Sequence, residues 1–569
     1  MSIEQLTIHI NSFIFFHEFY RKIIEKETIM TEINRIFKVN GKPFFPIGTE
    51  TVYAGYAMKP NEHENVFRDL KSINGNSMAI PVHWDAIEPE EGKFDFSSVD
   101  ILITNARKYG LKLILLWFGT WKNGGMEYVP EWIKTDPKRF RRALNAQGKD
   151  MWSLSPFCKA TLESDKKAFI ALMKYLKSKD SVEQTVISIQ VENEPGIVGT
   201  DRDYSPEGEK IYKAPVPPDF IAAMKKYGKG ATWELWQAAG AKKTGTWPEV
   251  LGYAPDAGHY MYVWHIAKFI DAVAEAGKAV YYLPMFVNLW TPPKWWTLHG
   301  AQAIDYVERE ILMDLYRWAT PHLETIAPDI YTRESRDFER QCDIHTRPDN
   351  PLFTTETSGD QNMFRAIAQF NAVGYHMAGI ENIFDKDGNV YPATQHIANN
   401  IKCVASVIPL LLKYQGTGRI HLVHEEFGMD SFWLGNLEGY YGMVQFGPPR
   451  MGAPSDWRHR KPPAPYGGYN PDNAGRGLII QAGKHEFYLT GFGWRLHLHS
   501  KLAPDKNRTV LSPNNFVFEP TEVHYLSVDQ GYFDANGKFV TVLRRNGGQI
   551  DWGLWVEGDI GVVRVLLCD

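Results

Sequence analysis

Residues 185–196 read Thr-Val-Ile-Ser-Ile-Gln-Val-Glu-Asn-Glu-Pro-Gly. Most of the first seven side chains are β-branched, which favours a buried strand, and the Pro-Gly pair predicts a turn directly after it. Glu192, Asn193 and Glu194 are therefore expected at the carboxyl end of a strand. In parallel α/β folds that end of the sheet carries the functional groups.

The chain on both sides of this stretch alternates short apolar runs with amphipathic segments, which favours a parallel sheet with helical crossovers. Eight such units can be counted. The expected strands cover 44–49, 77–83, 112–118, 185–191, 281–289, 326–331, 352–355 and 374–380, and the expected helices 62–74, 98–109, 160–178, 260–276, 300–319, 335–345, 361–372 and 393–413. The prediction is an α/β fold, a (β/α)8 TIM barrel. An open doubly wound sheet is the alternative, but no glycine-rich turn follows the first strand.

The 569 residues are too many for one ordinary core, so more than one domain is expected. We predict an N-terminal extension over 1–34, the barrel over 35–415 and a smaller all-β, sandwich-like domain over 416–569. The tail is expected to form strands at 419–423, 477–481, 485–490, 516–518, 523–528, 539–543 and 562–567, with an extended loop over 443–476. The long connection 195–258 should stand over the carboxyl ends of the barrel strands.

Composition narrows the classes of partner. The formal net charge is −5 and the pI about 6.4, which gives no electrostatic reason to expect nucleic acid. The four cysteines, Cys158, Cys342, Cys403 and Cys568, are far apart and fit reduced thiols in a cytoplasmic protein. No apolar run is long enough for a membrane span. The apolar segment at 10–16 is a poor secretory signal, and Met30 is an alternative start.

A second short strand also ends in a carboxylate: residues 351–359 read Pro-Leu-Phe-Thr-Thr-Glu-Thr-Ser-Gly. Ends of strands four and seven face each other across a barrel mouth, so Glu194 and Glu356 are expected to meet. Two carboxylates about 5–5.5 Å apart can cleave a glycosidic bond with retention, one as acid/base and one as nucleophile. Asn193 is placed to hydrogen-bond a sugar hydroxyl.

These motifs resemble clan A glycoside hydrolases. The string Gln-Val-Glu-Asn-Glu-Pro-Gly at 190–196 resembles the acid/base motif of family 35 β-galactosidases. The blocks at 115–124, 262–277 and 327–331 are similar to a bacterial branch of that family with a C-terminal domain of unassigned function. Residues 88–96 resemble an element that follows strand two in families 35 and 42. The sequence departs from the branch around Glu50 and around Glu356. These departures affect the prediction of which sugar is bound more than the prediction of the mechanism.

The resemblance implies a retaining, exo-acting β-galactosidase with Glu194 as acid/base and Glu356 as nucleophile, acting on oligo- or polysaccharides such as xyloglucan side chains. Tyr331 is expected to hydrogen-bond the nucleophile and favour its ionised form. Substrate contacts are further expected from strand ends and from an aromatic lip at 295–296. The predicted substrate-binding residues are Asn193, Glu50, His83, Trp84, Trp121, Lys122, Asn123, Asn288, Trp290, Tyr331 and Glu381.

The histidines and acidic residues show no trusted metal-ligand spacing, so no metal and no cofactor is expected. The expected partner is a carbohydrate, with no nucleic acid and no membrane. Three alternatives remain open: another exo-β-glycosidase (a glucosidase, fucosidase or arabinopyranosidase), a non-catalytic carbohydrate-binding barrel, and a transglycosylase that uses the same two glutamates.

Overall fold

The computed structural model describes residues 35–51, 60–252, 257–291, 306–447, 472–501, 523–550, 553–558 and 561–568. The expected N-terminal extension, the aromatic lip at 295–296 and the strand at 516–518 lie outside these ranges. Within them, no helix is long and apolar enough to cross a membrane. All four cysteines are free thiols, and Cys568 alone among them is exposed.

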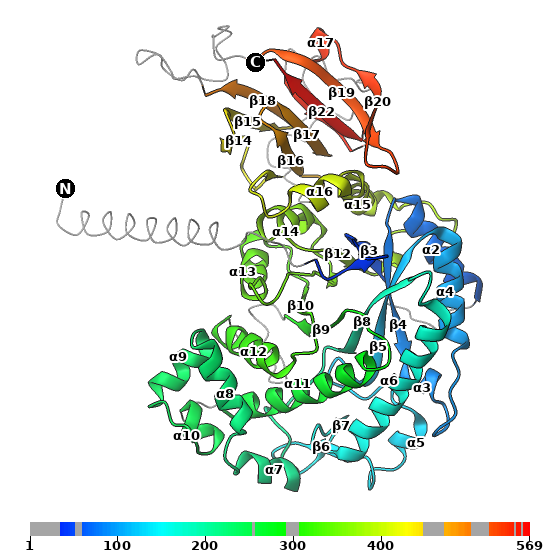
Figure 1. The fold of residues 1–569 in the computed structure, drawn as a ribbon, viewed down its shortest axis with the longest axis vertical. Helices are drawn as coiled ribbons and strands as arrows, with labels where there is room; N and C mark the ends of the chain where they lie inside the picture. The colour runs from blue at the N-terminus through cyan, green and yellow to red at the C-terminus, as the bar shows by residue number, and fades with distance from the viewer. Residues whose placement is uncertain are drawn as a thin grey trace, which may run out of the picture.

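Eight parallel strands form a barrel, as predicted (Figure 1). The last strand pairs with the first, and a bridge between Thr354 and Tyr375 closes the ring. Side chains from alternate strands, among them Ile114, Phe286 and Phe353, fill the interior. The strands in chain order are β3 (Ile47–Glu50), β4 (Ser77–His83), β5 (Lys112–Lys122), β8 (Val186–Asn193), β9 (Met285–Trp290), β10 (Thr325–Ile330), β11 (Glu356–Thr357) and β12 (Tyr375–Ala378).

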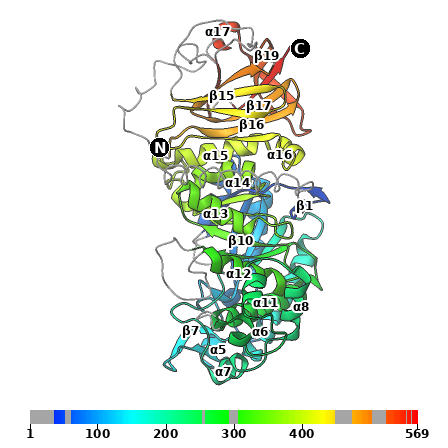
Figure 2. The same cartoon turned by 90° about the vertical axis from the view of Figure 1, so that its left-hand side faces the viewer.

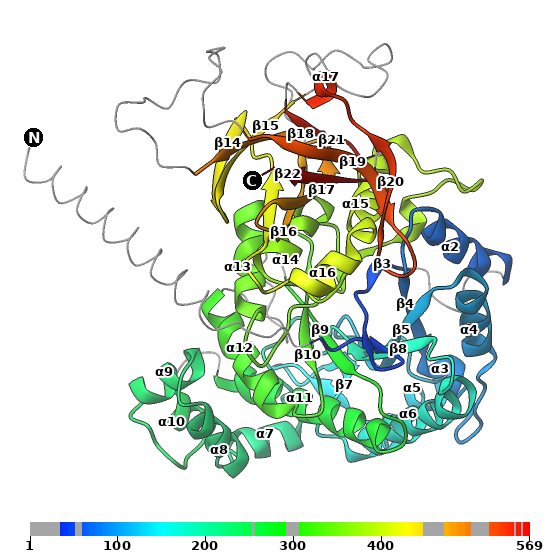
Figure 3. The same cartoon turned by 45° about the horizontal axis from the view of Figure 1, so that its top comes forward.

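Helices surround the barrel, and Figure 3 shows the strands inside their ring. In α4, for example, the apolar residues Val99, Leu102 and Ile103 recur at helical spacing and form the buried face of the helix. Helix α4 ends where Gly110 adopts a left-handed conformation and its N–H caps Ala106 and Arg107. The main helices are α2 (Pro60–Ser72), α4 (Ser97–Tyr109), α6 (Lys159–Asp180), α11 (Ala257–Lys278), α12 (Tyr306–Ala319), α13 (Ser335–His345), α14 (Met363–Gln369), α15 (Gln395–Ser406) and α16 (Ile408–Tyr414).

Two connections on the carboxyl side of the strands carry extra elements. The turn after β5 leads through α5 (Glu131–Lys134) into a small hairpin, β6 (Arg142–Leu144) and β7 (Asp150–Leu154). The connection after β8, expected as a long loop, contains short helices instead. These are α7 (Pro206–Tyr212), α8 (Pro218–Tyr227), α9 (Ala231–Ala238) and α10 (Trp247–Leu251). Proline at the first turns of α7, α8 and α10 favours these helix starts.

The C-terminal part is a pair of antiparallel sheets, as the fold prediction stated. One sheet has the order β13 (Ile420–His424), β16 (Arg476–Gly483), β17 (Glu486–Phe492), β22 (Val562–Leu567), β19 (Tyr525–Phe533) and β20 (Phe539–Arg544). The other has the order β14 (Ser431–Leu437), β15 (Tyr440–Phe446), β18 (Trp494–Ser500) and β21 (Leu554–Val556). Their facing sides bury one apolar cluster that includes Val444, Leu489 and Trp494.

The sandwich lies on α14, α15 and α16, at one side of the barrel (Figure 2). Charged groups reinforce this contact. The buried Arg476 of β16 donates to the carbonyl oxygen of Asp472 at 2.6 Å and approaches Asp360, just beyond β11, at 4.0 Å. Arg365 of α14 pairs with Glu426, which follows β13, at 2.6 Å. The sandwich is therefore tied to the segment that follows Glu356.

Several boundaries differ from the prediction. The expected strand at 352–355 pairs regularly only from Glu356 onward, because β10 meets the chain first at the Asp329–Glu356 pair. Strand β5 runs four residues beyond its expected end and carries Lys122 to a pair with Asn193. The expected loop at 443–476 was wrong at its start, since residues 443–446 complete β15.

Candidate active site

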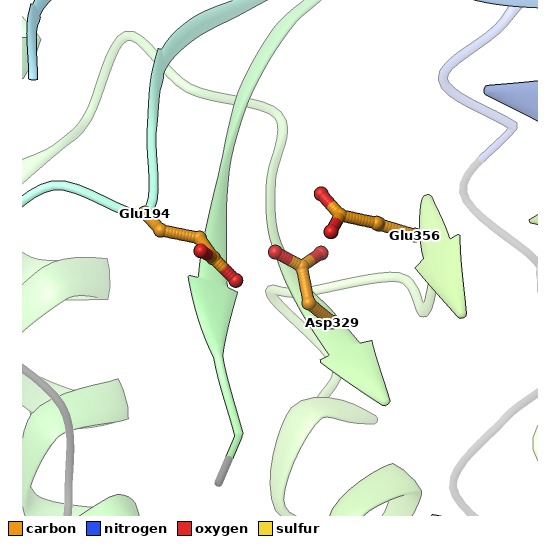
Figure 4. Close-up of side chains that lie close together, drawn as sticks. All are labelled: Glu194, Asp329 and Glu356. Atoms are coloured by element: carbon orange, nitrogen blue, oxygen red, sulfur yellow. The ribbon is translucent and has the colours of Figure 1, made fainter. Parts of the chain in front are cut away.

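The carboxyl ends of strands β3, β5, β8, β10 and β11 bring charged side chains together at one mouth of the barrel. Glu194 follows β8, Asp329 lies on β10, and Glu356 begins β11. One carboxylate oxygen from each of these three residues lies within 4.8 Å of the corresponding oxygens of the other two (Figure 4). All three residues are buried. Two residues that are 162 positions apart in the sequence, Glu194 and Glu356, thus face one gap.

Glu194 is held in a strained turn. Its φ is 43°, a left-handed conformation that is uncommon outside glycine. Its backbone N–H donates to the side-chain oxygen of Asn288 at 3.0 Å, which fixes the turn against β9. Burial, and next the negative charge of Glu356, raise the pKa of Glu194 to about 7, while Lys122 acts in the opposite direction. A carboxyl group of this kind can hold a proton near neutral pH.

Glu356 accepts hydrogen bonds from a residue of β9 and from one just beyond β10. The Tyr331 hydroxyl, just after β10, donates to one of its oxygens, and the amide nitrogen of Asn288 lies 3.4 Å from the other. The same amide donates to Asp329 at 2.6 Å. Burial, and next the charge of Glu356, raise the pKa of Tyr331, so this phenol is kept as a donor. The expected contact between Tyr331 and Glu356 is present.

Asp329 was not predicted as a site residue. It is fully buried between Glu194 and Glu356, and burial followed by their charges raises its pKa well above the usual range. The sequence signal was its place at the end of strand six, two residues before Tyr331. An aspartate at a strand end commonly forms an ordinary ion pair, so only its position in space singles it out.

Lys122 and Glu50 complete the ring of charge. The pKa of Lys122 is raised because the charges of Glu356, Glu194, Glu50 and Asp329 outweigh the opposing effect of burial. Glu50 lies at the end of β3, and burial, then Glu356, raise its pKa well above the usual range. Glu381 accepts a hydrogen bond from the Thr51 hydroxyl, next to Glu50. These predicted residues all belong to the cluster.

Asn193 offers a free amide beside the cluster. The residue is fully buried, yet neither its amide nitrogen nor its oxygen has a hydrogen-bond partner within the part of the chain that the structure describes. A buried amide without partners is costly. A ligand hydroxyl could satisfy both atoms, since a hydroxyl both donates and accepts.

The other predicted residues differ in their burial and in the groups that they contact. Trp84 lies in the core and donates to Glu88 at 3.0 Å. Trp121 is also buried and donates to the Ser153 hydroxyl at 3.2 Å. The exposed Asn123 forms a left-handed turn with φ 52°. The His83 ring lies 4.2 Å from the Tyr128 ring, centroid to centroid, and burial lowers the pKa of His83 to about 4. Trp290 is half-buried at the end of β9.

Among the described residues, the trio of Glu194, Asp329 and Glu356 is also the group whose oxygens could hold a metal ion. Such an oxygen set would suit a hard cation such as Mg²⁺ or Ca²⁺. The ammonium group of Lys122 already supplies positive charge to the same carboxylates. The absence of an essential metal stays a prediction.

The pKa of Glu194 predicts a pH profile. If Glu194 must be protonated in the first step, kcat/KM should fall about tenfold per pH unit above its pKa of about 7. Lys122→Met should move this fall to higher pH, because Lys122 lowers the pKa of Glu194. Lys122→Arg, which keeps the charge, is the control. If kcat/KM of Lys122→Met falls at the same pH as that of the wild type, the assignment of Glu194 as the acid is contradicted.

A (β/α)8 barrel with two facing carboxylates at the ends of its fourth and seventh strands is the architecture of a glycoside hydrolase. Residues 36–263 match the family model described as "Glycosyl hydrolases family 35". Residues 397–557 match a second model, described as a domain of unknown function (DUF5597). The first match contains Glu194 and ends before Glu356.

Similar proteins include the human "Beta-galactosidase-1-like protein 3", which is 29% identical over 181 residues, 29% of this chain and 25% of that protein. The chain thus matches a quarter of the length of this curated relative. Among solved structures, the catalytic domain of a β-amylase from Paenibacillus polymyxa aligns with a TM-score of 0.45 at 14% identity, covering 63% of this chain and 98% of that chain. A β-galactosidase from the psychrophilic Marinomonas ef1 aligns with a TM-score of 0.44 at 12% identity, covering 64% and 60% of the two chains.

Proposed function

We propose that this protein is a retaining, exo-acting β-galactosidase that releases terminal β-galactose from oligo- or polysaccharides. The observation that supports the mechanism is the spacing of Glu194 and Glu356: one carboxylate oxygen of Glu194 lies within 4.8 Å of one of Glu356. Retaining enzymes need carboxyl groups about 5–5.5 Å apart, whereas inverting enzymes separate them by about 6.5–9.5 Å to admit a water molecule. The gap here favours direct attack by a carboxylate.

In the first step, Glu356 attacks the anomeric carbon while Glu194 gives its proton to the departing oxygen. The bond from the sugar to its leaving group breaks, and an ester to Glu356 forms with inversion. Esterification removes the negative charge that helps to raise the pKa of Glu194, so this pKa falls and Glu194 becomes a base. It then takes a proton from water, which attacks the ester carbon from the face the leaving group had occupied. Two inversions return the β configuration.

Neighbouring groups prepare both carboxylates for these roles. Tyr331 and Asn288 donate to Glu356 and hold it in one orientation. The free amide of Asn193 is available for the sugar 2-hydroxyl, a contact that strengthens in an oxocarbenium-like transition state. The match to the family 35 model and the name of the human relative support galactose as the sugar.

A panel of aryl β-glycosides tests the sugar. We expect the highest kcat/KM on the β-galactoside, with lower values on the β-glucoside, β-fucoside and α-arabinopyranoside. A preference for one of the others would keep the mechanism and replace the sugar. Binding of glycans without turnover on any member would support a non-catalytic barrel instead.

The stereochemical course is a separate prediction. Proton NMR of the first-formed free sugar should show the β anomer before mutarotation produces the α anomer, because two displacements restore the configuration. The equilibrated sugar in the same buffer is the control for signal assignment. An α anomer that appears first would refute retention and the nucleophilic role of Glu356.

A further inference from the structure

A second pair of carboxyl groups lies behind the acidic cluster and outside the chemistry proposed above. Glu192, on β8, and Asp165, on α6, are both fully buried. Both side chains border Gly119, so the two carboxyl groups lie close together. A Cβ atom at that glycine would lie 2.8 Å from a Glu192 oxygen and 2.9 Å from an Asp165 oxygen. Two carboxylates can hydrogen-bond only if one of them carries a proton.

The surrounding donors indicate which residue carries it. Asp165 accepts from the Trp117 indole at 2.9 Å, from the Thr120 hydroxyl at 2.6 Å and from the Thr120 backbone N–H at 3.2 Å. Three donors directed at one carboxyl group favour its ionised form. Glu192 accepts the Trp121 N–H with one oxygen, at 2.7 Å. Its other oxygen borders Gly119 beside Asp165 and forms no geometrically defined hydrogen bond among the described residues.

We propose that Glu192 is a neutral carboxylic acid that donates its proton in a hydrogen bond to ionised Asp165, and that this pair is a positioning device for Glu194. Burial, the first cause for both groups, raises the pKa of each, and the charge of Asp165 raises that of Glu192 further. The inference rests on the proposed function, since it assigns a role to residues that act through Glu194.

The backbone next to the pair shows what it holds. Glu192 and Glu194 both adopt left-handed conformations, with φ 65° and 43°, which persist only where the surroundings enforce them. The end of β5 and the turn after it bind the same segment: the Asn123 N–H donates to the Asn193 carbonyl at 3.1 Å, and the Gly124 N–H to the Glu194 carbonyl at 3.0 Å. The pair joins these two segments from behind, so it fixes Lys122, Asn193 and Glu194 relative to one another.

The test exploits the shape of glutamine. In Glu192→Gln the amide N–H replaces the acid O–H toward Asp165, and the amide oxygen still accepts from Trp121, so kcat on an aryl β-galactoside should stay within about threefold of the wild type. Asp165→Asn places an NH₂ group against the Trp117 and Thr120 donors. Glu192→Leu removes the hydrogen bond from Trp121 and the proposed one to Asp165. Each should lower kcat by about 10²-fold, the loss that a displacement near 1 Å produces.

A positioning role also predicts a readout that lost stability would not change. The pH at which kcat/KM falls depends on how closely Glu194 faces Glu356, so it should shift in Asp165→Asn and Glu192→Leu and stay in place in Glu192→Gln. Thermal unfolding of each variant shows what fraction is folded. If Asp165→Asn keeps its activity and Glu192→Gln loses it, the proton lies on Asp165 and the proposal is overturned. It is also overturned if Asp165→Asn and Glu192→Gln both keep their activity or lose it equally.

Infrared difference spectroscopy separates this inference from the proposed function. The wild type minus Glu192→Gln spectrum at neutral pH should contain the C=O band of a protonated carboxylic acid, whether or not any glycoside is hydrolysed. A carboxylate band in its place would overturn the protonation state. A protein that shows the acid band but cleaves no aryl glycoside would refute the proposed function alone.

Discussion

Glu356→Gly is expected to lower kcat on aryl β-galactosides by on the order of 10⁴-fold or more, the scale of losing a covalent nucleophile. Nothing else in the cluster can replace the missing carboxylate. Asp329 is close, but its pKa is raised well above the usual range and it accepts a hydrogen bond from Asn288. Steady-state rates on an aryl galactoside with an activated leaving group measure the loss.

Azide gives this variant a distinctive rescue. A small anion can enter the space left by the side chain and attack the same face of the sugar, so the product should be the α-galactosyl azide, formed with one inversion. Asp349→Asn is the matched control, because Asp349 is partly exposed and pairs with Arg347 at 3.5 Å in the turn before the same segment. Near wild-type turnover of Glu356→Gly would refute the nucleophile assignment.

Glu194→Ala is expected to lower kcat/KM by about 10²–10⁴-fold on galactosides with poor leaving groups, the usual worth of a general acid. Galactosides with dinitrophenyl leaving groups need no proton, so their kcat/KM should change by less than about tenfold. The comparison uses kcat/KM because this parameter reports the first displacement. A series of aryl galactosides with graded leaving groups measures the slope.

In this variant azide should accelerate the second displacement and yield the β-galactosyl azide, the opposite anomer to that from Glu356→Gly. Glu183→Gln is the matched control: Glu183 precedes the same strand at the other end of the barrel, is half exposed and pairs with Arg107 at 3.3 Å. Equal losses on good and poor leaving groups would count against Glu194 as the acid.

The sequence was sufficient for the barrel because its hydrophobic pattern is local. The expected strand at 77–83 and helix at 335–345 match β4 and α13 residue for residue. Each forms from a continuous run whose period reveals its buried face. The strands at 431–446 were missed because apolar residues such as Trp433 and Tyr441 are exposed and hide the alternation of buried and exposed positions. The pairing of β14 with β15, and of β15 with β18, defines these strands.

The same distinction separates the parts of the candidate site. Glu194 and Glu356 could be predicted because each ends a recognisable strand beside residues of suitable chemistry. Asp329 and the pair of Asp165 and Glu192 could not, because a carboxyl group acquires a role from its neighbours and its burial. In the sequence, Asp165 looks like an ordinary charged residue of a helix. It meets Glu192 only once α6 packs against β5 and β8.

The sequence by itself determined the order of strands and helices, and hence which residues end up at the carboxyl side of the barrel. Closure of the sheet decided the rest: the gap between Glu194 and Glu356, the position of Lys122 beside both, and the raised pKa of Glu194 near 7. The physical reason is the range over which each effect acts. Hydrophobic periodicity acts over a few residues of chain, whereas charge interaction and desolvation depend on distances in space between residues that are far apart in sequence.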